Sequence, residues 1–333
     1  MTIRSASGTH VGLVREHNED SYLARPDLGL WVVADGMGGH LAGEVASQIA
    51  VNEMALRVAQ GETLASAVAA THHAVLAAVA RGEGQPGMGT TLVALQIKDM
   101  QYQIAWVGDS RAYLMGAHGF RQLSRDHSFV QQLLDAGAIG EAEALQHPDR
   151  NVVTQAIGTP GMANVRVDTV EGQLFQGDQV LLCSDGLTSE VSNPRIHELL
   201  ASPGNEAAKL ETLIAAALVH GGSDNVTVVL VSAPADAPEH PQRGSTVPID
   251  SRLLNRAITN NRAKQTHAVI WASVTGALLA LLLAIGWTMK DKITGQAATT
   301  EPSTIQISPG LNTNNPVSRP QKGEKNAEAP IQK

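Results

Sequence analysis

The sequence has almost no cysteine and is short of basic residues. The first shortage excludes an internal disulfide, and the second argues against a nucleic-acid partner. Cys183 is the single cysteine among 333 residues, so an internal disulfide is impossible, which suits a reducing compartment. Because Cys183 lies in the apolar run VLLC, we expect a buried structural thiol rather than a reactive one. Lys and Arg number 24 against 32 Asp and Glu, which argues against nucleic acid as a partner. The first residues, MTIRSASGTHVG, contain no apolar run, so we expect no secretory signal.

One long apolar run lies toward the C-terminal end. Residues Ala268–Met289 carry no charge over about 22 positions, enough for a helix to cross a hydrocarbon core of about 30 Å. Trp271 and Trp287 lie near its two ends, where indole rings favour the membrane interface. Basic residues crowd its upstream side: Arg252, Arg256, Arg262 and Lys264. By the positive-inside bias we expect a single-pass protein of the cytoplasmic (inner) membrane, with its main domain in the cytoplasm.

Composition divides the rest of the chain. Residues 1–235 carry the strand and helix patterns and form the expected soluble domain. Residues 236–267 are rich in Pro, Ala and charge and then basic, as in a linker and juxtamembrane segment. Residues 290–333 have the low hydrophobicity of a disordered tail, which this topology places outside the cytoplasm.

The soluble region alternates groups of strands with blocks of helices. Apolar or alternating runs predict strands at residues 30–34, 91–97, 102–107, 112–115, 179–184 and 226–231. Helical periodicity predicts helices at residues 44–60, 64–81, 129–136 and within 205–220. This order favours an α+β fold with antiparallel sheets covered by helices. His72 and His73 point to different sides of the second helix, and we expect them at the surface or its boundary.

Two predicted strands end on Asp-Gly, in LWVVADGMGGH and QVLLCSDGL. Asp-Gly usually turns a hairpin, yet the residues after Leu41 have helical rather than strand periodicity. The glycines do not form a nucleotide loop either, because the third position of a G-x-G-x-x-G pattern falls on Leu41 and no Gly-Lys-Ser/Thr follows. The aspartates are therefore the candidate metal-binding or catalytic residues of these two motifs.

Four aspartates each follow or adjoin a predicted strand: Asp35, Asp109, Asp185 and Asp224. Carboxylates at strand ends can converge from distant parts of a chain, and such a cluster requires cations to offset its repulsion. Oxygen ligands suit Mg²⁺ or Mn²⁺ rather than Zn²⁺, and Gly36 allows a backbone carbonyl to approach an ion. Spacing alone leaves metal-assisted hydrolysis and structural cation binding open. Arg15, shortly before Glu19 and Asp20, favours hydrolysis because it could bind a phosphate.

A family resemblance rests on eight short motifs in order: REHNEDS, VVADGMGGH, GTTLVAL, WVGDSRAYL, LSRDHS, HPDRNVVTQAIG, LLCSDGL and GGSDNVTVV. Over about residues 8–232 the sequence resembles the PP2C-type (PPM family) metal-dependent serine/threonine protein phosphatases, in particular their bacterial branch. The resemblance implies a β-sandwich of two antiparallel sheets flanked by helices, in four α-β-β-α layers. It also implies hydrolysis of phosphoserine and phosphothreonine on proteins by a hydroxide bridging two Mn²⁺ or Mg²⁺ ions, reversing a bacterial Ser/Thr kinase.

The resemblance implies a set of metal ligands at one end of the sandwich. Asp35 corresponds to the carboxylate that bridges both metals, and the Gly36 carbonyl to a ligand of the second. Asp185 and Asp224 correspond to the remaining ligands of the first metal. Asp109 corresponds to the ligand of a third, weaker metal. Residues 127–158 resemble the variable flap beside this centre, which is expected to influence substrate choice and third-metal binding.

The resemblance also assigns roles to residues around the metals, but it leaves the proton donor unassigned. Arg15 corresponds to the phosphate-binding arginine, and Glu19 and Asp20 to the acidic pair that supports the centre. Met37 stands where eukaryotic members often have a histidine that protonates the leaving oxygen, so the proton donor is open. His40 is near, although a capping or structural role is the stronger expectation for it. The alternative is a catalytically inactive PP2C-fold binding or regulatory module at the membrane, but an inactive member should have lost a core aspartate.

Overall fold

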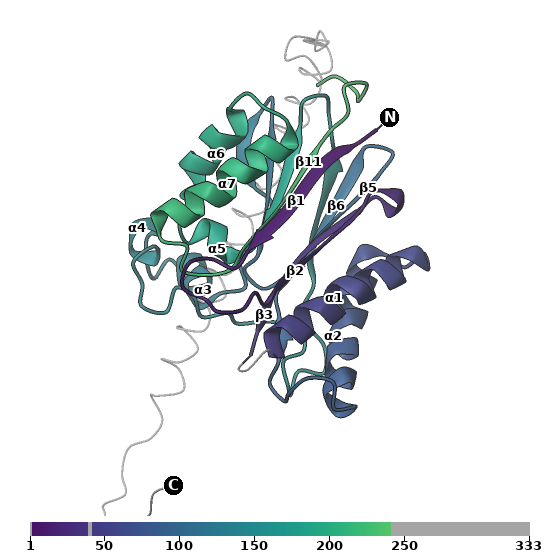
Figure 1. The fold of residues 1–333 in the computed structure, drawn as a ribbon, viewed down its shortest axis with the longest axis vertical. Coiled ribbons are helices and arrows are strands. Elements are labelled where there is room, and N and C mark those ends of the chain that lie inside the picture. The colour runs from purple at the N-terminus through teal and green to yellow at the C-terminus, as the bar shows by residue number, and fades with distance from the viewer. Residues whose placement is uncertain (1, 39–41, 241–333) are drawn as a thin grey trace, which may run out of the picture. The chain divides into compact units, whose positions relative to one another are not determined.

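Two antiparallel β-sheets pack face to face in the computed structural model, which describes residues 2–38 and 42–240 (Figure 1). The first sheet has the strand order β1 (Arg4–His10), β11 (Val226–Ser232), β10 (Gln179–Cys183), β7 (Arg111–Gly116) and β8 (Gly119–Gln122). The second has the order β2 (Asp20–Arg25), β3 (Leu30–Met37), β5 (Leu92–Lys98), β6 (Gln101–Val107) and β9 (Asp168–Gln173), and β4 (Gly89–Thr90) pairs with the end of β3. Every pairing between these strands is antiparallel, as the resemblance implies.

Helices cover the outer face of each sheet (Figure 1). The second sheet is covered by α1 (Ala42–Ala59) and α2 (Leu64–Ala80). The first is covered by α6 (Asn193–Ala201) and α7 (Glu206–His220). Shorter helical turns form between strands: η1 (Pro26–Leu28), α3 (Phe129–Asp135), α4 (Glu141–Ala144) and α5 (Asp185–Thr188). The two sheets and the two helical layers confirm the expected four-layer arrangement.

The alternation of side chains along the strands builds three apolar layers. On β3, Leu30 and Val32 face α1 and α2, whereas Trp31 and Val33 point into the space between the sheets. Because both faces of β3 are buried, its sequence is an unbroken apolar run. Cys183, on β10, is fully buried beneath α6 and α7, and burial raises the pKa of its thiol to about 12. The prediction of an inert structural thiol is therefore confirmed.

The strands that the sequence analysis missed lack an apolar pattern. Residues 4–10 read RSASGTH, yet they form β1 because each pairs in register with β11, from Arg4 opposite Ser232 to His10 opposite Val226. The edge strands β2 and β9 are similarly polar. Backbone pairing with an apolar central strand thus overrides weak intrinsic preference. The Asp-Gly of β3 also differs from expectation, since the strand continues to Met37, which pairs with Gly89 of β4.

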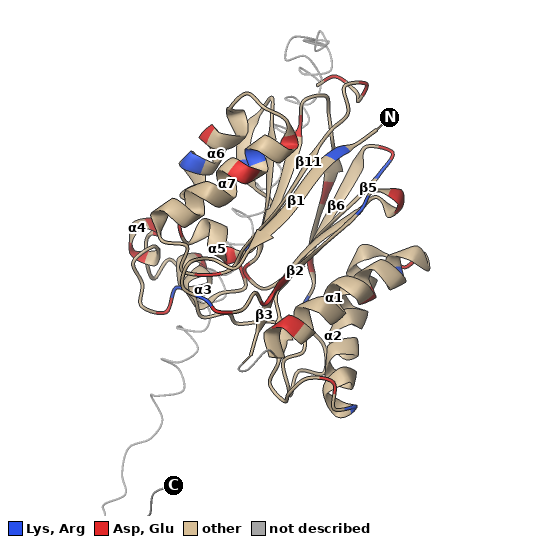
Figure 2. Ribbon diagram, in the orientation of Figure 1, with Lys and Arg blue, Asp and Glu red and all other residues tan. Residues whose placement is uncertain are grey.

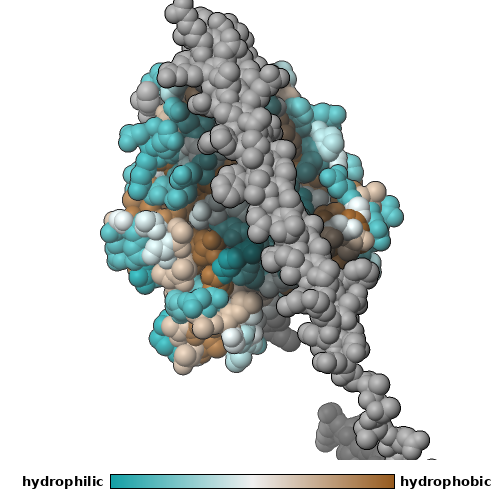
Figure 3. All heavy atoms as spheres, turned by 180° about the vertical axis from the view of Figure 1, so that it is seen from behind, coloured by the Kyte–Doolittle hydropathy of each residue, from teal (hydrophilic) through white to brown (hydrophobic). Residues whose placement is uncertain are grey.

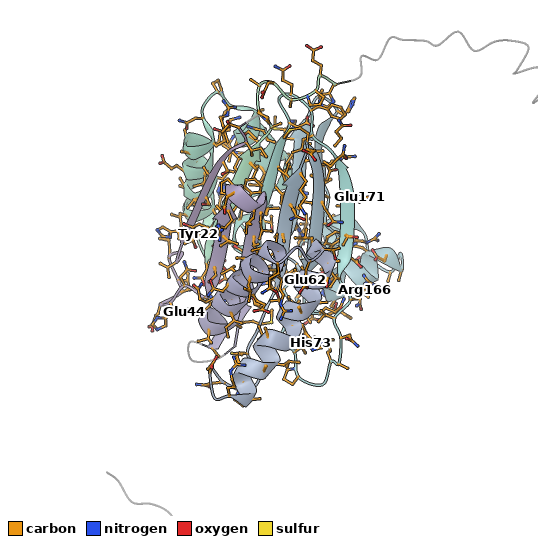
Figure 4. All side chains as sticks on the ribbon, turned by 90° about the vertical axis from the view of Figure 1, so that its right-hand side faces the viewer. Tyr22, Glu44, Glu62, His73, Arg166 and Glu171 are labelled. Carbon is orange, nitrogen blue, oxygen red and sulfur yellow. The ribbon has the colours of Figure 1, made fainter. Side chains whose placement is uncertain are left out.

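The two neighbouring histidines of α2 have different surroundings. Figure 4 shows His73 on the layer of helices that covers the second sheet, and its side chain is exposed. His72 is fully buried, so the expectation of a surface or boundary position is wrong for this residue. Its Nδ1 accepts the Gly158 N–H at 3.1 Å, which leaves Nε2 to donate to the Met162 carbonyl at 3.0 Å. With both nitrogens satisfied, the ring is buried without an unpaired polar group.

The chain packs onto the sandwich as far as His240. Ala237 is buried, and His240 Nε2 lies 2.7 Å from Asp178 Oδ1. None of the helices within residues 2–38 and 42–240 has the length and apolarity required to span a membrane. The predicted span Ala268–Met289, the tail at 290–333 and linker residues 241–267 all lie outside the described residues.

Candidate active site

The strand-end aspartates converge at one end of the sandwich. Asp35 lies near the end of β3, Asp185 begins α5 directly after β10, and Asp224 precedes β11. Asp109 follows β6, and its charge, like those of Asp185 and Asp224, acts on Asp35. Figure 2 shows acidic residues gathered at the ends of β2 and β3 and beside α5. Segments about 190 residues apart in sequence thus place carboxylates in one electrostatic cluster.

The β2–β3 pairing brings a further carboxylate into the cluster, because Asp20 lies directly opposite Asp35. Asp20 Oδ2 accepts the Ser184 hydroxyl at 2.8 Å. Its other oxygen, Oδ1, is buried without a hydrogen-bond partner in the described part of the chain. Burial, aided by repulsion from Asp185 and Asp224, raises the pKa of Asp20 to about 7.

Desolvation and mutual repulsion raise the pKa of the other carboxyls as well. The pKa of Asp109 rises to about 8, first through burial and then through repulsion from Asp185. The pKa of Asp35 is raised well above its ordinary value by the same two causes, and that of Asp185 is raised too. The cluster therefore holds more negative charge than its surroundings compensate.

Arg15 is the one basic side chain of residues 2–38 and 42–240 that forms an ion pair with these carboxylates. Its Nη2 lies 2.8 Å from Asp224 Oδ2, and this hydrogen bond raises the pKa of Arg15. About half of the Arg15 side chain stays exposed, at 53%. A guanidinium has five N–H donors, so donors beyond the Asp224 contact face the solvent at the mouth of the cluster. Such a group can bind a phosphate there.

Asn225, which the sequence analysis did not assign, anchors the loop that carries Arg15 and Glu19. Its Oδ1 accepts the Glu19 N–H at 2.8 Å. Its Nδ2 donates to the Val11 carbonyl at 2.8 Å and to the His17 carbonyl at 2.9 Å. The side chain is buried and all of its strong donors and acceptors are used. The available signal was its position directly after Asp224 in the motif GGSDNVTVV.

Two glycines allow backbones to cross at the site. A Cβ on Gly36 would overlap the Gly43 carbonyl, so a glycine is what lets the first turn of α1 lie against the end of β3. A Cβ on Gly186 would overlap the Asn225 carbonyl. The glycine of each Asp-Gly pair therefore has a steric role that the hairpin interpretation could not supply. The Gly36 amide donates to the Glu19 carbonyl at 3.1 Å, which ties β3 to the Arg15 loop.

The loop that carries Asp109 is fixed by His127. His127 Nδ1 accepts the Gly108 N–H at 3.1 Å, and the His127 amide donates to the Gly108 carbonyl at 2.9 Å. His127 Nε2 lies 3.3 Å from Asp168 Oδ2 on β9, and its carbonyl accepts the Thr154 N–H at 2.7 Å. Burial lowers the pKa of His127. One residue at the start of the predicted flap thus holds both the flap base and the Asp109 loop.

A cavity of about 470 Å³ opens beside the cluster, between the flap and the α5–α6 region. Asp109 and Asp185 line one part of it, and Leu134, Leu145 and Pro194 line another. Met37 occupies the end of β3, and its thioether has no proton to donate. His40 lies outside the described residues.

The donor set fits divalent cations. Within the described residues no three Asp, Glu, His or Cys side chains are already arranged as ligands of one ion. The carboxylates nevertheless share one cluster, Asp20 Oδ1 is buried and unpaired, and the positive charges of Arg15 and Arg111 offset the repulsion only in part. Hard oxygen donors with excess negative charge are the ligands that Mg²⁺ and Mn²⁺ prefer.

Comparisons with known proteins identify the family of the chain. The family model described as Protein phosphatase 2C matches residues 8–219. The chain is 39% identical over 236 residues to "Serine/threonine phosphatase stp" of Listeria monocytogenes, covering 67% of this chain and 93% of the relative. It is 39% identical over 237 residues to "Protein phosphatase PhpP" of Streptococcus pneumoniae, covering 67% and 95%. The chain therefore belongs to the protein phosphatase 2C family.

Solved structures of similar proteins have the same fold. The serine/threonine phosphatase PstP/Ppp of Mycobacterium tuberculosis gives a TM-score of 0.64 at 39% identity, covering 72% of this chain and all of that one. A PstP catalytic domain solved in complex with two manganese ions gives a TM-score of 0.61 at 37% identity, covering 69% of this chain and 97% of that one. The sandwich described above is thus the PP2C-type fold.

Proposed function

We infer that the protein removes phosphate from serine and threonine side chains of other proteins, as its relatives are named for doing. It is a PP2C-type, metal-dependent protein serine/threonine phosphatase. The observation that carries this function is the carboxylate cluster of Asp35, Asp185 and Asp224 with Arg15 at its mouth. A degenerate, non-catalytic member would be expected to have lost one of these aspartates, and this chain retains all three.

We propose a division of roles among the residues of the site. Asp35, Asp185 and Asp224 would hold two core Mn²⁺ or Mg²⁺ ions together with the Gly36 carbonyl, and Asp109 would hold a third. When bound, such ions acidify a water molecule and neutralise charge on the phosphoryl oxygens. Arg15 keeps its free guanidinium donors toward the same space and would orient the phosphate by hydrogen bonds. Glu19 and Asp20 would support the ligands, because Asp20 faces Asp35 across β2 and β3 and the Glu19 carboxylate lies against the α1 backbone at Gly43.

The hydrolysis requires no covalent intermediate on the protein. Ser184 donates to Asp20 and is fully buried, so it is not placed as a nucleophile. Ser110 is likewise buried and pairs with Thr91. Both hydroxyls therefore serve the structure of the site, and water is the nucleophile that remains.

The test is turnover by the full chain. With Mn²⁺ present, the protein should release phosphate from p-nitrophenyl phosphate and from a phosphothreonine peptide, and EDTA should stop both reactions. Asp35→Asn should remove activity on both substrates. A full chain that binds Mn²⁺ but releases no phosphate from either substrate would instead support the inactive binding or regulatory module.

We further propose that residues 268–289 anchor the enzyme in the cytoplasmic membrane, with residues 290–333 outside and the catalytic domain in the cytoplasm, where it reverses a Ser/Thr kinase. The uncharged run and the basic residues before it support this topology. The full chain should stay in the membrane fraction after alkaline carbonate extraction, and deletion of 268–289 should release it. Release of the intact chain by carbonate would refute the anchor.

A further inference from the structure

Large apolar side chains are exposed directly beside Arg15. Leu13 and Val14 immediately precede it and expose 65% and 69% of their surfaces. Val219, at the C-terminal end of α7, exposes 83%. Single exposed apolar residues are ordinary on a protein surface, but a group of them beside a site is typical of a surface that binds another molecule.

Contacts bring Leu13 and Leu218 together from two parts of the chain, and Val14 and Val219 directly follow them in sequence. The Leu13 amide donates to the Gly222 carbonyl at 2.7 Å, which joins the Arg15 loop to the segment between α7 and Asp224. A Cβ on Gly222 would lie 3.1 Å from both Leu13 Cγ and Leu218 Cδ2. Figure 1 shows the β1–β2 loop against the end of α7. We call Leu13, Val14, Leu218 and Val219 the apolar rim; none of them carries a charge.

Both chain segments that form the rim lead within a few residues to the candidate phosphate site. Along the chain, Leu13 is two residues from Arg15, and Gly222 is two residues from Asp224. An extended substrate rises about 3.3 Å per residue, so residues within three positions of the phosphorylated one lie within roughly 10 Å of it. A phosphoprotein bound through Arg15 therefore has flanking residues within reach of the rim.

We propose that the apolar rim binds an apolar side chain of the phosphoprotein substrate, one to three residues from the phosphorylated Ser or Thr. This inference rests on the proposed phosphatase function and adds a substrate preference to it. The catalytic step requires only the phosphate, whereas the rim contributes affinity for flanking residues. Small substrates without flanking residues cannot use it.

The experiment compares three substrates and three forms of the full chain. The substrates are p-nitrophenyl phosphate, a phosphothreonine peptide with Leu at positions −2 and +2, and the same peptide with Ser there. The proteins are the unmodified chain, the double variant Leu13→Ser/Val219→Ser, and Leu56→Ser as the control. Leu56 is exposed on α1, outside the rim, and Leu56→Ser removes a comparable apolar side chain.

The unmodified chain should prefer the Leu peptide by about tenfold in kcat/KM, which corresponds to about 1.4 kcal/mol. The double variant should lose that preference while its turnover of the Ser peptide and of p-nitrophenyl phosphate stays unchanged. The control should behave as the unmodified chain does.

Four other outcomes would overturn the inference. An unmodified chain without preference has no such subsite, and an equal loss on all three substrates places the rim in the catalytic machinery. A dimer that the double variant converts to a monomer in sedimentation assigns the rim to a second copy. Faster peptide turnover by the variant assigns it to a segment of this chain. Failure of the unmodified chain on p-nitrophenyl phosphate with Mn²⁺ would instead refute the phosphatase function itself.

Discussion

Asn225 illustrates how a neutral side chain holds a charged site. Its amide group satisfies one N–H and two carbonyls of the loop at residues 11–19, and that loop carries Arg15 and Glu19. The four strand-end aspartates were predictable from the sequence because each follows or adjoins an apolar run. Asn225 was not, because its partners are more than 200 residues away in the chain.

Asn225→Ala should therefore loosen the Arg15 loop. Three backbone groups would lose their partner, and we expect unfolding to become easier by about 1–3 kcal/mol because buried polar groups would be left unpaired. KM for a phosphopeptide should rise more than kcat falls, since Arg15 is the residue proposed to bind the phosphate. Urea unfolding and steady-state kinetics measure both effects. Asn52→Ala, on the exposed side of α1, serves as the control, and equal behaviour of the two variants would contradict the anchoring role.

At the scale of elements, the junction of β3 and α1 determines the site. The sequence predicted a strand at residues 30–34 and a helix at residues 44–60, with ends correct to within a few residues. It could not predict that Met37 still pairs with β4, or that Gly36 meets the α1 backbone at Gly43, because both contacts depend on how the elements cross in three dimensions. The polar strands β1 and β2 were missed for the same reason.

Gly36→Ala should separate β3 from α1. The added Cβ would overlap the backbone carbonyl of Gly43, which no rotamer change can relieve, so we expect destabilisation of about 1–3 kcal/mol and a large loss of turnover. Gly140→Ala is the matched control, because a Cβ there meets nothing within 4 Å and the backbone is extended. Thermal unfolding and p-nitrophenyl phosphate turnover report the two effects, and a stable, active Gly36→Ala protein would disprove the steric argument.

His127 links two further elements, the Asp109 loop and the base of the flap. Replacing it with Ala leaves the buried Gly108 N–H without a partner, so that of the two bonds to Gly108 only the backbone one from the residue 127 amide remains. We expect the Mn²⁺ concentration for half-maximal activity to rise severalfold, since Asp109 would be held less firmly in place. His127→Asn, which can still accept from Gly108, should recover part of this loss. An unchanged Mn²⁺ requirement in His127→Ala would show that the loop is positioned by other contacts.

For the molecule as a whole, the cluster makes stability depend on pH and on metal. Burial raises the pKa of Asp20 to about 7 and that of Asp109 to about 8. A carboxyl whose pKa is higher in the folded state than in the unfolded one binds more protons when folded. Stability from these groups is therefore present at low pH and declines as the pH rises through the folded-state values.

The metal-free protein should accordingly have a lower Tm at about pH 8 than at about pH 6. Added Mn²⁺ should raise Tm more at pH 8, because protons no longer compete for the carboxylates and a ligand of the folded state stabilises it. Calorimetry after EDTA treatment and dialysis gives the Tm at each pH, first without Mn²⁺ and then with Mn²⁺ added. A larger Mn²⁺ effect at pH 6 would contradict the assignment of these carboxylates to a cation site.

The surface of the molecule limits where recognition can occur. On the part of the rear face that Figure 3 leaves visible, apolar areas lie among hydrophilic ones. The net charge of −8 also argues against binding driven by attraction to anionic partners. Arg15 and the uncharged apolar rim next to it are thus the features on which phosphoprotein recognition is proposed to depend.

The central claim is that Asp35, Asp185 and Asp224 hold the ions on which phosphate release depends. Mn²⁺ bound per full chain should be measured by calorimetric titration, together with phosphate release from a phosphothreonine peptide, for the unmodified chain and for Asp35→Asn. For the unmodified chain we predict about two tightly bound Mn²⁺ ions and EDTA-sensitive turnover. For Asp35→Asn we predict that both are lost while the Tm stays the same or rises, because a buried charge is removed. An Asp35→Asn protein that binds Mn²⁺ and releases phosphate as the unmodified chain does would contradict the claim.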